Sequence, residues 1–477
     1  MATASASTAT ALSVVAIAVS TTARALTVEA TAVTTTERAL TLEATAVPST
    51  AKALAVTATA VPTTARALAV TVTAFTTQAT AFPVAGNAFP TTAGAFPVTV
   101  ALMELDSVAM KPTDIAGGIA LLEGATSQRV LVAVEGLEVA GQNAFGEPVA
   151  VERGTDVPAL VKRCAEAAGN GERVALVARA VDLAAARGEL ARLAVRGRGV
   201  VVHAIAESGL AGVPACEAGI APALTLGDLP WGMLISAGVG DAIDLGLVAR
   251  RAAEDSGCPF FVVHERGHHA ESVAAPSREL VESFLGGPRP SAQPPPATSD
   301  RAFAERAPFA LASAMRELDA LTARHHDVIQ RAPSTDAALA MVGLGAPGAA
   351  LLAGVDRQRA AGHEVVAVRV VAWRPFPGAR LVKALHRALA ITVLEGVDRP
   401  LAANGPLAVQ LKAAFADALT WAPDYPGIGR IPRIVSGVVT PRRELEPGDL
   451  DAIVHNLLAD ERGKRTFVVG MEPATLL

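Results

Sequence analysis

The sequence has 477 residues, of which 51% are hydrophobic, 18% charged and 4% aromatic, and its formal net charge is −5. At roughly 100 to 200 residues per domain, this length predicts two or three domains with a sizeable core and excludes a small disulfide scaffold. The mild acidity gives no electrostatic footprint for nucleic acid, because a phosphate-binding surface needs a local excess of Lys and Arg. We therefore expect no DNA or RNA partner.

The cysteines and the apolar runs indicate the compartment. Cys164, Cys216 and Cys258 lie far apart with no Cys-x-x-Cys pair, so this chain cannot hold an iron–sulfur cluster by itself. No apolar run reaches the roughly 18 to 20 residues of a membrane helix. The apolar stretch from Ala11 to Val19 has no preceding Lys or Arg, which a signal peptide requires. We expect a cytoplasmic protein that does not associate with membranes.

The first hundred residues form a repeat of seven. Apolar residues recur at this interval from Leu12 and Val19 to Phe96, each directly after an Ala. A seven-residue apolar period is typical of a coiled coil, but Pro48, Pro62 and later prolines directly follow the repeated apolar residue and would break a helix. We therefore expect residues 1–102 to be a low-complexity extension, extended or disordered, in which short alternating runs could pair as strands. A tandem repeat in the coding DNA would give the same pattern, so we expect the functional protein to begin near Met103 or Met110.

Beyond Met103 the composition becomes that of an ordinary globular protein, and short apolar runs alternate with amphipathic stretches. The expected strands are residues 129–134, 173–178, 199–206 and 259–264, and the expected helices are residues 157–168, 183–195 and 239–256. Near-continuous apolar strands separated by helices predict a mostly parallel sheet with helices on both faces. We assign residues 103–285 to this first α/β domain.

A Pro-rich stretch begins at Gly286 and has the composition of a linker, so residues 286–330 are expected to be a linker followed by a helix. Residues 331–477 repeat the alternation of the first domain. The expected strands here are residues 337–345, 364–371, 390–394, 433–435 and 466–469, and the expected helices are residues 347–361, 381–389, 407–418 and 450–458. The predicted fold class is thus α/β, with two doubly wound, mostly parallel sheet domains.

Three stretches, in order, resemble the 2-oxoacid:ferredoxin oxidoreductases, of which pyruvate:ferredoxin (or flavodoxin) oxidoreductase is the familiar member. Residues 231–261, beginning Trp231-Gly-Met-Leu-Ile-Ser-Ala-Gly, are similar to the family's segment in which a small-residue turn leads into a helix and a strand. Residues 365–377, VVAVRVVAWRPFP, look like its strand and Arg-Pro-Phe-Pro turn, and Phe467-Val-Val-Gly is similar to its closing strand. The resemblance is to the first two domains of the α-type subunit. It implies a pyrimidine-binding-like domain of thiamine diphosphate enzymes followed by a transketolase C-terminal-like domain.

The resemblance implies oxidative decarboxylation of a 2-oxoacid on thiamine diphosphate, with electrons passing through iron–sulfur clusters to ferredoxin or flavodoxin. It also implies a thiamine-binding β-type subunit and an iron–sulfur subunit as partners, so that this chain alone is inactive. In the family, a glutamate of this first domain hydrogen-bonds the aminopyrimidine ring of the cofactor. Glu152, in Val-Ala-Val-Glu, stands at the matching distance upstream of residues 199–206. It is the expected catalytic and cofactor-binding residue, the alternative being an ordinary solvated carboxylate.

Two departures from the family pattern leave a second function open. The family's Pro-Ile-Thr-Pro-Ser-Ser segment has no counterpart between Asp114 and Glu152, and Ala206 stands where the family has the arginine that binds the substrate carboxylate. A carboxylate in a dry site needs a cationic or hydrogen-bond-donating partner, which alanine does not supply. The alternative is a non-catalytic paralogue that acts as a scaffold or regulator.

A different class of function is indicated by His264-Glu265-Arg266-Gly267-His268, which satisfies the HExxH pattern. On a helix, His264 and His268 would share one face and could bind zinc, with Glu265 as the base that activates water. Glu279 or Glu282 could supply a third ligand. The preceding Pro259-Phe-Phe-Val-Val favours a buried strand, and Gly267 disfavours a helix, so the zinc hydrolase is the weaker hypothesis.

Two further motifs have ordinary structural interpretations. His325-His326 lies in a polar stretch with no other ligand at metal spacing, which favours a solvated helix surface. Gly343, Gly345 and Gly348 nominally satisfy GxGxxG after an apolar strand, but Pro347 and the lack of a well-placed ribose acid weaken the dinucleotide interpretation. We expect these glycines to be structural.

Overall fold

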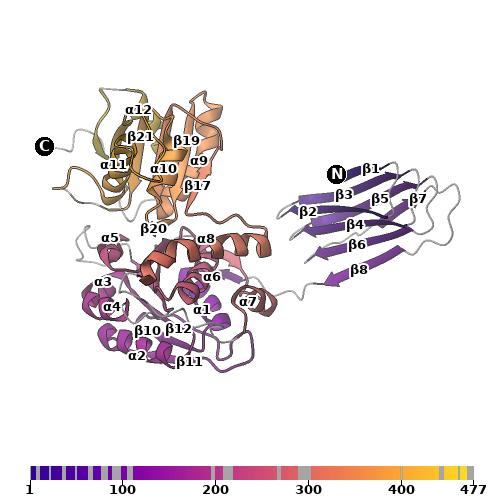
Figure 1. Cartoon of the computed structure of the whole chain (residues 1–477), viewed down its shortest axis with the longest axis horizontal. Helices are drawn as coiled ribbons and strands as arrows, with labels where there is room; N and C mark the ends of the chain where they lie inside the picture. The colour runs from indigo at the N-terminus through magenta and orange to yellow at the C-terminus, as the bar shows by residue number, and fades with distance from the viewer. Residues whose placement is uncertain are drawn as a thin grey trace. The chain divides into compact units, whose positions relative to one another are not determined.

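The computed structural model describes most of residues 111–477 and, before them, the backbone of eight strands (Figure 1). The described ranges after residue 110 are 111–194, 199–207, 219–265, 270–287, 302–397, 399, 401–439, 445–459 and 462–469. The chain divides into two compact units, Met1–Met110 and Lys111–Leu477. Among the helices of the described residues, none is both long enough and apolar enough to cross a lipid bilayer.

The first unit contains two parallel sheets, each of four strands. One sheet contains β1 (Ala2–Ala6), β3 (Ala23–Thr34), β5 (Ala51–Pro62) and β7 (Val84–Ala88), and the other contains β2 (Ala11–Ser20), β4 (Ala39–Pro48), β6 (Leu68–Thr76) and β8 (Val98–Glu104). Ala2 pairs with Ala30 and Ala11 with Ala39, an offset of 28 residues or four repeats, so neighbouring strands match in repeat phase. Pro48 and Pro62 are the last residues of their strands, where a missing backbone N–H does least harm to the ladder. The domain boundaries expected from the sequence stay a prediction.

The second unit begins with a seven-stranded sheet in the order β11-β10-β12-β13-β15-β14-β20. Its strands are β10 (Arg129–Val132), β11 (Ala150–Arg153), β12 (Val174–Arg179), β13 (Val201–Ala206), β14 (Gly232–Ile235), β15 (Phe260–Glu265) and β20 (Ala372–Arg374). All pairs are parallel except β14 with β20, and the central strands are buried along their whole length, as the near-continuous apolar runs predict. The short strands β9 (Lys111–Thr113) and β16 (Glu271–Val273) pair beside it in antiparallel fashion.

Helices cover both faces of this sheet (Figure 1). On one side α2 (Val157–Gly169), α3 (Ala180–Ala185), α4 (Arg187–Ala194) and α5 (Ala221–Leu224), followed by a 3-10 turn (Thr225–Asp228), share a single hydrophobic core. On the other side α1 (Ile115–Thr126), α6 (Val239–Ser256), α7 (Arg278–Leu285) and α8 (Ala302–Thr322) pack in two further cores. Helix α6 matches the predicted range and ends at Gly257, whose φ of 73° favours glycine.

The second sheet has six strands in the order β17-β19-β18-β21-β22-β23. They are β17 (Ile329–Ala332), β18 (Leu339–Leu344), β19 (Val365–Val370), β21 (Ala390–Glu395), β22 (Arg433–Val438) and β23 (Thr466–Val468), and only β17 is antiparallel to its neighbour. Helices α9 (Gly345–Ala360) and α12 (Pro447–Leu458) pack in one core of this sheet, and α10 (Gly378–Leu385) and α11 (Pro406–Leu419) pack in another. The predicted α/β class with two mostly parallel sheets is confirmed.

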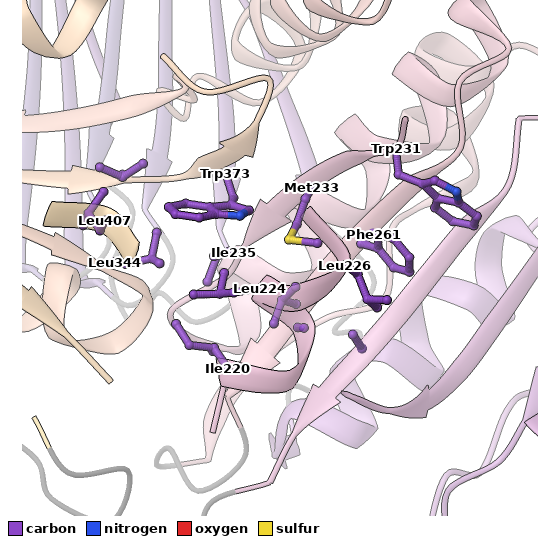
Figure 2. Close-up of a cluster of buried hydrophobic side chains, with 14 of the residues drawn as sticks. Ile220, Leu224, Leu226, Trp231, Met233, Ile235, Phe261, Leu344, Trp373 and Leu407 are labelled. Carbon is purple, nitrogen blue, oxygen red and sulfur yellow. The ribbon is translucent and has the colours of Figure 1, made fainter. Parts of the chain in front are cut away.

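The two sheets share one core. Strand β20 follows β19 of the second sheet after a single residue and pairs with β14 at the edge of the first sheet. Trp373 of β20 is buried beside Met233 and Ile235 of β14, and Leu344 of β18 and Leu407 of α11 belong to the same cluster (Figure 2). The guanidinium of Arg374 lies 4.7 Å from the ring centroid of Trp373 and donates to the carbonyl of Gly227. Removal of strand β20 would therefore expose the hydrophobic core that the two sheets share.

A histidine with two carboxylate partners joins α6 to α8. His326 Nδ1 lies 2.8 Å from Asp319 of α8 and its Nε2 lies 3.0 Å from Asp244 of α6. Arg324 also binds Asp244 through two hydrogen bonds of 2.7 and 2.6 Å. Burial lowers the pKa of His326, but the bonds and charges of the two carboxylates outweigh it and raise that pKa above its ordinary value. The His325-His326 pair is thus neither a metal site nor wholly solvated.

We predict that this contact stabilises the protein more in mild acid than in base. Since the pKa of His326 is higher in the folded chain, its contribution is fully present below about pH 6.5 and is lost as the pH rises through the folded pKa. Urea unfolding should show that His326→Gln lowers the free energy of unfolding more at pH 5.5 than at pH 8.5. The exposed neighbour His325 provides the control, because His325→Gln should have a small effect at both pH values. An equal loss for His326→Gln at both pH values would contradict the prediction.

Candidate functional site

An open pocket of about 910 Å³ lies at the carboxyl ends of strands β10 to β13. Its charged lining residues are Glu135, Arg153, Arg179, Asp182 and Glu207, each of which follows or ends a strand or begins the next helix. Charged side chains are tolerated here because the apolar strands end at this rim and the residues that follow them are exposed to solvent. The pocket has the size of a small-molecule site and is more polar than most.

The topology explains why a pocket forms at this edge. The connection after β10 leads to β11 on one side, while β12 and β13 continue the sheet on the other. The loops therefore diverge and leave a crevice at the topological switch point, the usual ligand position in open α/β sheets. Arg179 is held there by two hydrogen bonds to Asp182, of 2.7 and 2.9 Å, which raise its pKa, and the charge of Glu207 acts in the same direction.

Glu152 lies outside the lining of this pocket. Its carboxylate forms one ion pair with Arg129 of the adjacent strand β10 and a second, of 2.5 Å, with Arg163 of α2. Arg129 is the first residue of β10 and also binds Glu172, which lies just before β12. The ion pairs of Arg129 therefore lie toward the amino ends of the strands. Glu152 is therefore a partly buried, doubly paired carboxylate on the edge strand β11.

The end of β13 places a carboxylate at the pocket instead of a cation. Ala206 is the last residue of β13 and is 1% exposed, and Glu207 after it lines the pocket. Alanine cannot bind a substrate carboxylate at this point, and the cations of the pocket lining, Arg153 and Arg179, come from other strands.

The first two HExxH residues lie on a strand and not on the helix that a zinc site of this kind requires. His264 and Glu265 are the last residues of strand β15, where neighbouring side chains point to opposite faces of the sheet. Both ring nitrogens of His264 have a partner at 2.9 Å, Ser236 Oγ and His203 Nδ1. His268 lies outside the described residues, as do Arg266 and Gly267. Within the described residues, no group of three His, Cys, Asp or Glu is arranged to hold a metal ion.

His264 instead belongs to a buried hydrogen-bonded chain across four elements. From Ser236 and His264 it continues through His203 of β13 to Glu123 of α1, at 2.8 Å, and ends at Arg250 of α6, at 2.5 Å. All five residues are at most 1% exposed. Burial raises the pKa of Glu123, but Arg250 and His203 outweigh it and bring that pKa to about 2, while burial keeps the pKa of His264 well below its ordinary value. The Glu123–Arg250 pair is thus ionised, with His264 neutral beside it.

Glu265 connects the two sheets through a helix N-terminus. Its carboxylate accepts a 2.7 Å hydrogen bond from the backbone N–H of Ala346 in the first turn of α9. A side chain at Gly345, whose φ is 58°, would collide with this carboxylate, and Gly343 and Gly348 allow β18 and α9 to touch. The glycines singled out in the sequence are therefore structural and serve close contact. Burial raises the pKa of Glu265 to about 7, although the bond from Ala346 and the charge of Arg369 oppose the rise.

Glu395 repeats this arrangement within the second sheet. It ends β21 and accepts hydrogen bonds from the backbone N–H groups of Leu407, at 2.7 Å, and Ala408, at 3.1 Å, in the first turn of α11. Burial raises its pKa to about 7 against those two bonds. Both carboxylates take the place that an anion would occupy at a helix N-terminus.

Comparisons with known proteins decide the family resemblance. No protein-family model matches the chain. It is 25% identical over 195 residues to pyruvate synthase subunit PorA of Pyrococcus furiosus, covering 35% of this chain and 48% of that relative. The chain is similar to the 2-oxoacid:ferredoxin oxidoreductases. It thus spans about half the length of the curated relative that it matches.

A solved structure of low sequence identity shares the fold of this chain. The 2-oxoglutarate:ferredoxin oxidoreductase of Magnetococcus marinus, solved with 2-oxoglutarate, coenzyme A and succinyl-CoA bound, has a TM-score of 0.51 and 14% identity, over 76% of this chain and 68% of its own. A split-gene transketolase, described as an inactive β4 tetramer, has a TM-score of 0.46 and 16% identity, over 73% of this chain and 99% of its own. The predicted resemblance of this chain to the 2-oxoacid:ferredoxin oxidoreductase family is confirmed, as that of a divergent relative.

The sequence analysis did not single out several residues of the pocket and of the buried hydrogen-bonded network. The pocket residues Arg179 and Asp182 directly follow the apolar run of β12, and a charged pair at that position is a usable local signal. His203 and Glu123 are 80 residues apart and give no local signal of their contact. The catalytic role expected for Glu152 stays a prediction.

We predict that loss of one partner from the buried hydrogen-bonded group that includes Glu123 and Arg250 is strongly destabilising. Glu123→Gln leaves the charge of Arg250 buried without its ion, so the free energy of unfolding should fall by about 3–5 kcal/mol. The double variant Glu123→Gln/Arg250→Met should recover part of that loss, because no unpaired charge remains. Asp255→Asn removes an exposed ion pair with Arg251 on the same helix and should cost less than about 1 kcal/mol. Equal losses for Glu123→Gln and Asp255→Asn in urea unfolding would contradict the prediction.

We also predict that two buried carboxyls make stability fall as the pH rises. The pKa values of Glu265 and Glu395 are raised from 4.5 to about 7, so between these values the folded chain holds protons that the unfolded chain has lost. The contribution of these two carboxyls to the free energy of unfolding should decrease from about pH 4.5 to about pH 7 and then level off. Glu265→Gln and Glu395→Gln should each remove part of this slope in urea titrations. A slope that both variants leave unchanged would show that other groups cause it.

Proposed function

We propose that this chain is the α-type subunit of a 2-oxoacid:ferredoxin oxidoreductase-like complex, supplying two α/β domains to an assembly whose other chains carry the iron–sulfur clusters and most of the thiamine diphosphate site. The pocket at the switch point of the first sheet is the observation that carries this proposal. It lies at the edge where the strands of an open α/β sheet present ligand-binding loops, and its open side leaves room for a partner chain. The similarity to PorA, a pyruvate synthase subunit, supports the subunit role.

Thiamine diphosphate supplies the carbanion-stabilising chemistry in such enzymes, and the pocket residues do not fit the contact expected for it. The carboxylate expected to bind the aminopyrimidine, Glu152, is held by Arg129 and Arg163 outside the pocket lining. A carboxylate already paired with two guanidiniums has fewer acceptor positions left for a further hydrogen bond. We therefore derive no catalytic step through the cofactor for this chain.

This misfit favours a second candidate within the same assembly, a non-catalytic α-type paralogue that acts as a scaffold or regulator. Glu207, rather than a cation, follows Ala206 at the pocket. The pocket of such a paralogue would lack a cation directly after Ala206, although Arg153 and Arg179 line it elsewhere. The two candidates share the assembly and differ in whether Glu152 is needed for turnover.

The decisive experiment is reconstitution of the full chain with thiamine-binding and iron–sulfur subunits from the same organism, followed by assays of 2-oxoacid decarboxylation. For a catalytic subunit, Glu152→Gln should lower turnover by about 100-fold or more, as expected for loss of a positioned proton-transfer group. Glu172→Gln is the matched control, because Glu172 also binds Arg129 without being a site candidate.

Each outcome separates the candidates. Turnover that requires this chain and is lost only in Glu152→Gln supports the catalytic subunit. An assembly whose turnover is the same with the wild-type chain and both variants supports the non-catalytic paralogue. Failure of this chain to join any thiamine-dependent assembly would overturn the proposal.

A further inference from the structure

A second pocket lies in the second sheet, away from the switch-point pocket of the first. It has a volume of about 660 Å³ and is bounded by α11, the loop before it, and the segments at which β22 and β23 begin. Its polar lining residues are Asn404, Lys412, Arg433, Arg465 and Thr466. The volume falls within the range of small-molecule sites and exceeds the space that a single inorganic ion fills.

The charge of this pocket is one-sided. Lys412, Arg433 and Arg465 line it, and no carboxylate is part of its lining among the residues that the structure describes. Lys412 Nζ donates to the neutral amide oxygen of Asn404 at 2.5 Å, and Arg433 donates to the carbonyl of Leu457 at 2.5 Å. Lys412 and Arg465 line the same cavity, and neither forms an ion pair within the described part of the chain.

The environment of Lys412 is that of a cation without a counter-ion. Burial lowers the pKa of its ammonium group, and the positive charge of Arg465 lowers it further. Buried arginines of this chain meet carboxylates, as in the pairs Arg250–Glu123 and Arg173–Glu254, whereas Lys412 is partly buried and Arg465 is exposed. A bound anion would supply an opposite charge for both side chains and would oppose the lowering of the Lys412 pKa.

We propose that this pocket binds a phosphate-bearing small molecule. Guanidinium and ammonium groups together are the usual phosphate ligands, the first through paired N–H donors and the second as a point charge. The hydroxyl of Thr466 and the amide of Asn404 supply neutral donors at the same rim. The pocket would thus add a phosphate-recognition site to a domain for which the proposed function assigns no ligand of its own.

Isothermal titration calorimetry of the full chain at low salt tests the proposal with inorganic phosphate, pyrophosphate and ATP as probes. We expect saturable binding of at least pyrophosphate or ATP, weakened about tenfold or more in each of Lys412→Met and Arg465→Met and weakened further in the double variant. Lys383→Met, on the neighbouring helix α10, should bind like the wild type. Tighter binding of ATP than of pyrophosphate would identify a nucleotide-sized ligand, and equal binding would identify recognition of the phosphates alone.

The outcomes that overturn the proposal are distinct. Absence of binding for all three probes, or equal binding by the wild type and the folded Lys412→Met/Arg465→Met variant, would show that the pocket is not a phosphate site. Asp460 and Glu461 lie just before this part of the sequence and outside the described residues, so the Asp460→Asn/Glu461→Gln variant is titrated in parallel. Binding seen only in that variant would show that the chain's own carboxylates occupy the pocket, and the proposal would fail. Thermal melts identify any variant that does not fold.

Discussion

The antiparallel pairing of β20 with β14 is the interaction on which the second unit depends. Through it the chain crosses from one sheet to the other within a single residue of β19, and Trp373 brings its indole into a core shared by both. Two polar contacts at this junction depend on the same pairing: Arg369 reaches the carbonyl of Ile235 and the carboxylate of Asp241, and Glu265 meets the first turn of α9. The two domains therefore form one continuous structure rather than two independent ones.

Buried carboxylates are stabilised in two different ways in this protein. Glu123 is met by a guanidinium and remains ionised, whereas Glu265 and Glu395 are met by backbone N–H groups of helix N-termini, and burial raises their pKa values to about 7. The partial positive charge of a helix terminus is about half an elementary charge and offsets desolvation less completely than a full ion does. The sign of each pKa shift follows from the partner that the fold provides.

Much of the fold could be predicted from the sequence because its strands are buried and its helices have clear ends. Helix α6 and strand β13 illustrate this: an apolar run or a small-residue turn begins each, and Gly257 ends the helix. Strands β11, β14 and β20 were missed, because three or four residues carry too little pattern and their pairing is decided by distant segments. The position of Glu152 was inferred from spacing alone, and spacing carries no information about the arginines that its side chain meets across β10 and α2.

The 28-residue pairing offset in residues 1–110 has an evolutionary consequence. Because each strand pairs with one that lies four repeats later, excision or duplication of 28 residues would remove or add one strand in each sheet and leave every other partner in phase. Gain or loss of a single heptapeptide would preserve the sequence repeat. It would, however, lengthen or shorten one connection and misalign the strands that this connection joins. Length variation among alleles of this segment should therefore proceed in steps of four heptapeptides wherever the paired sheets are maintained by selection.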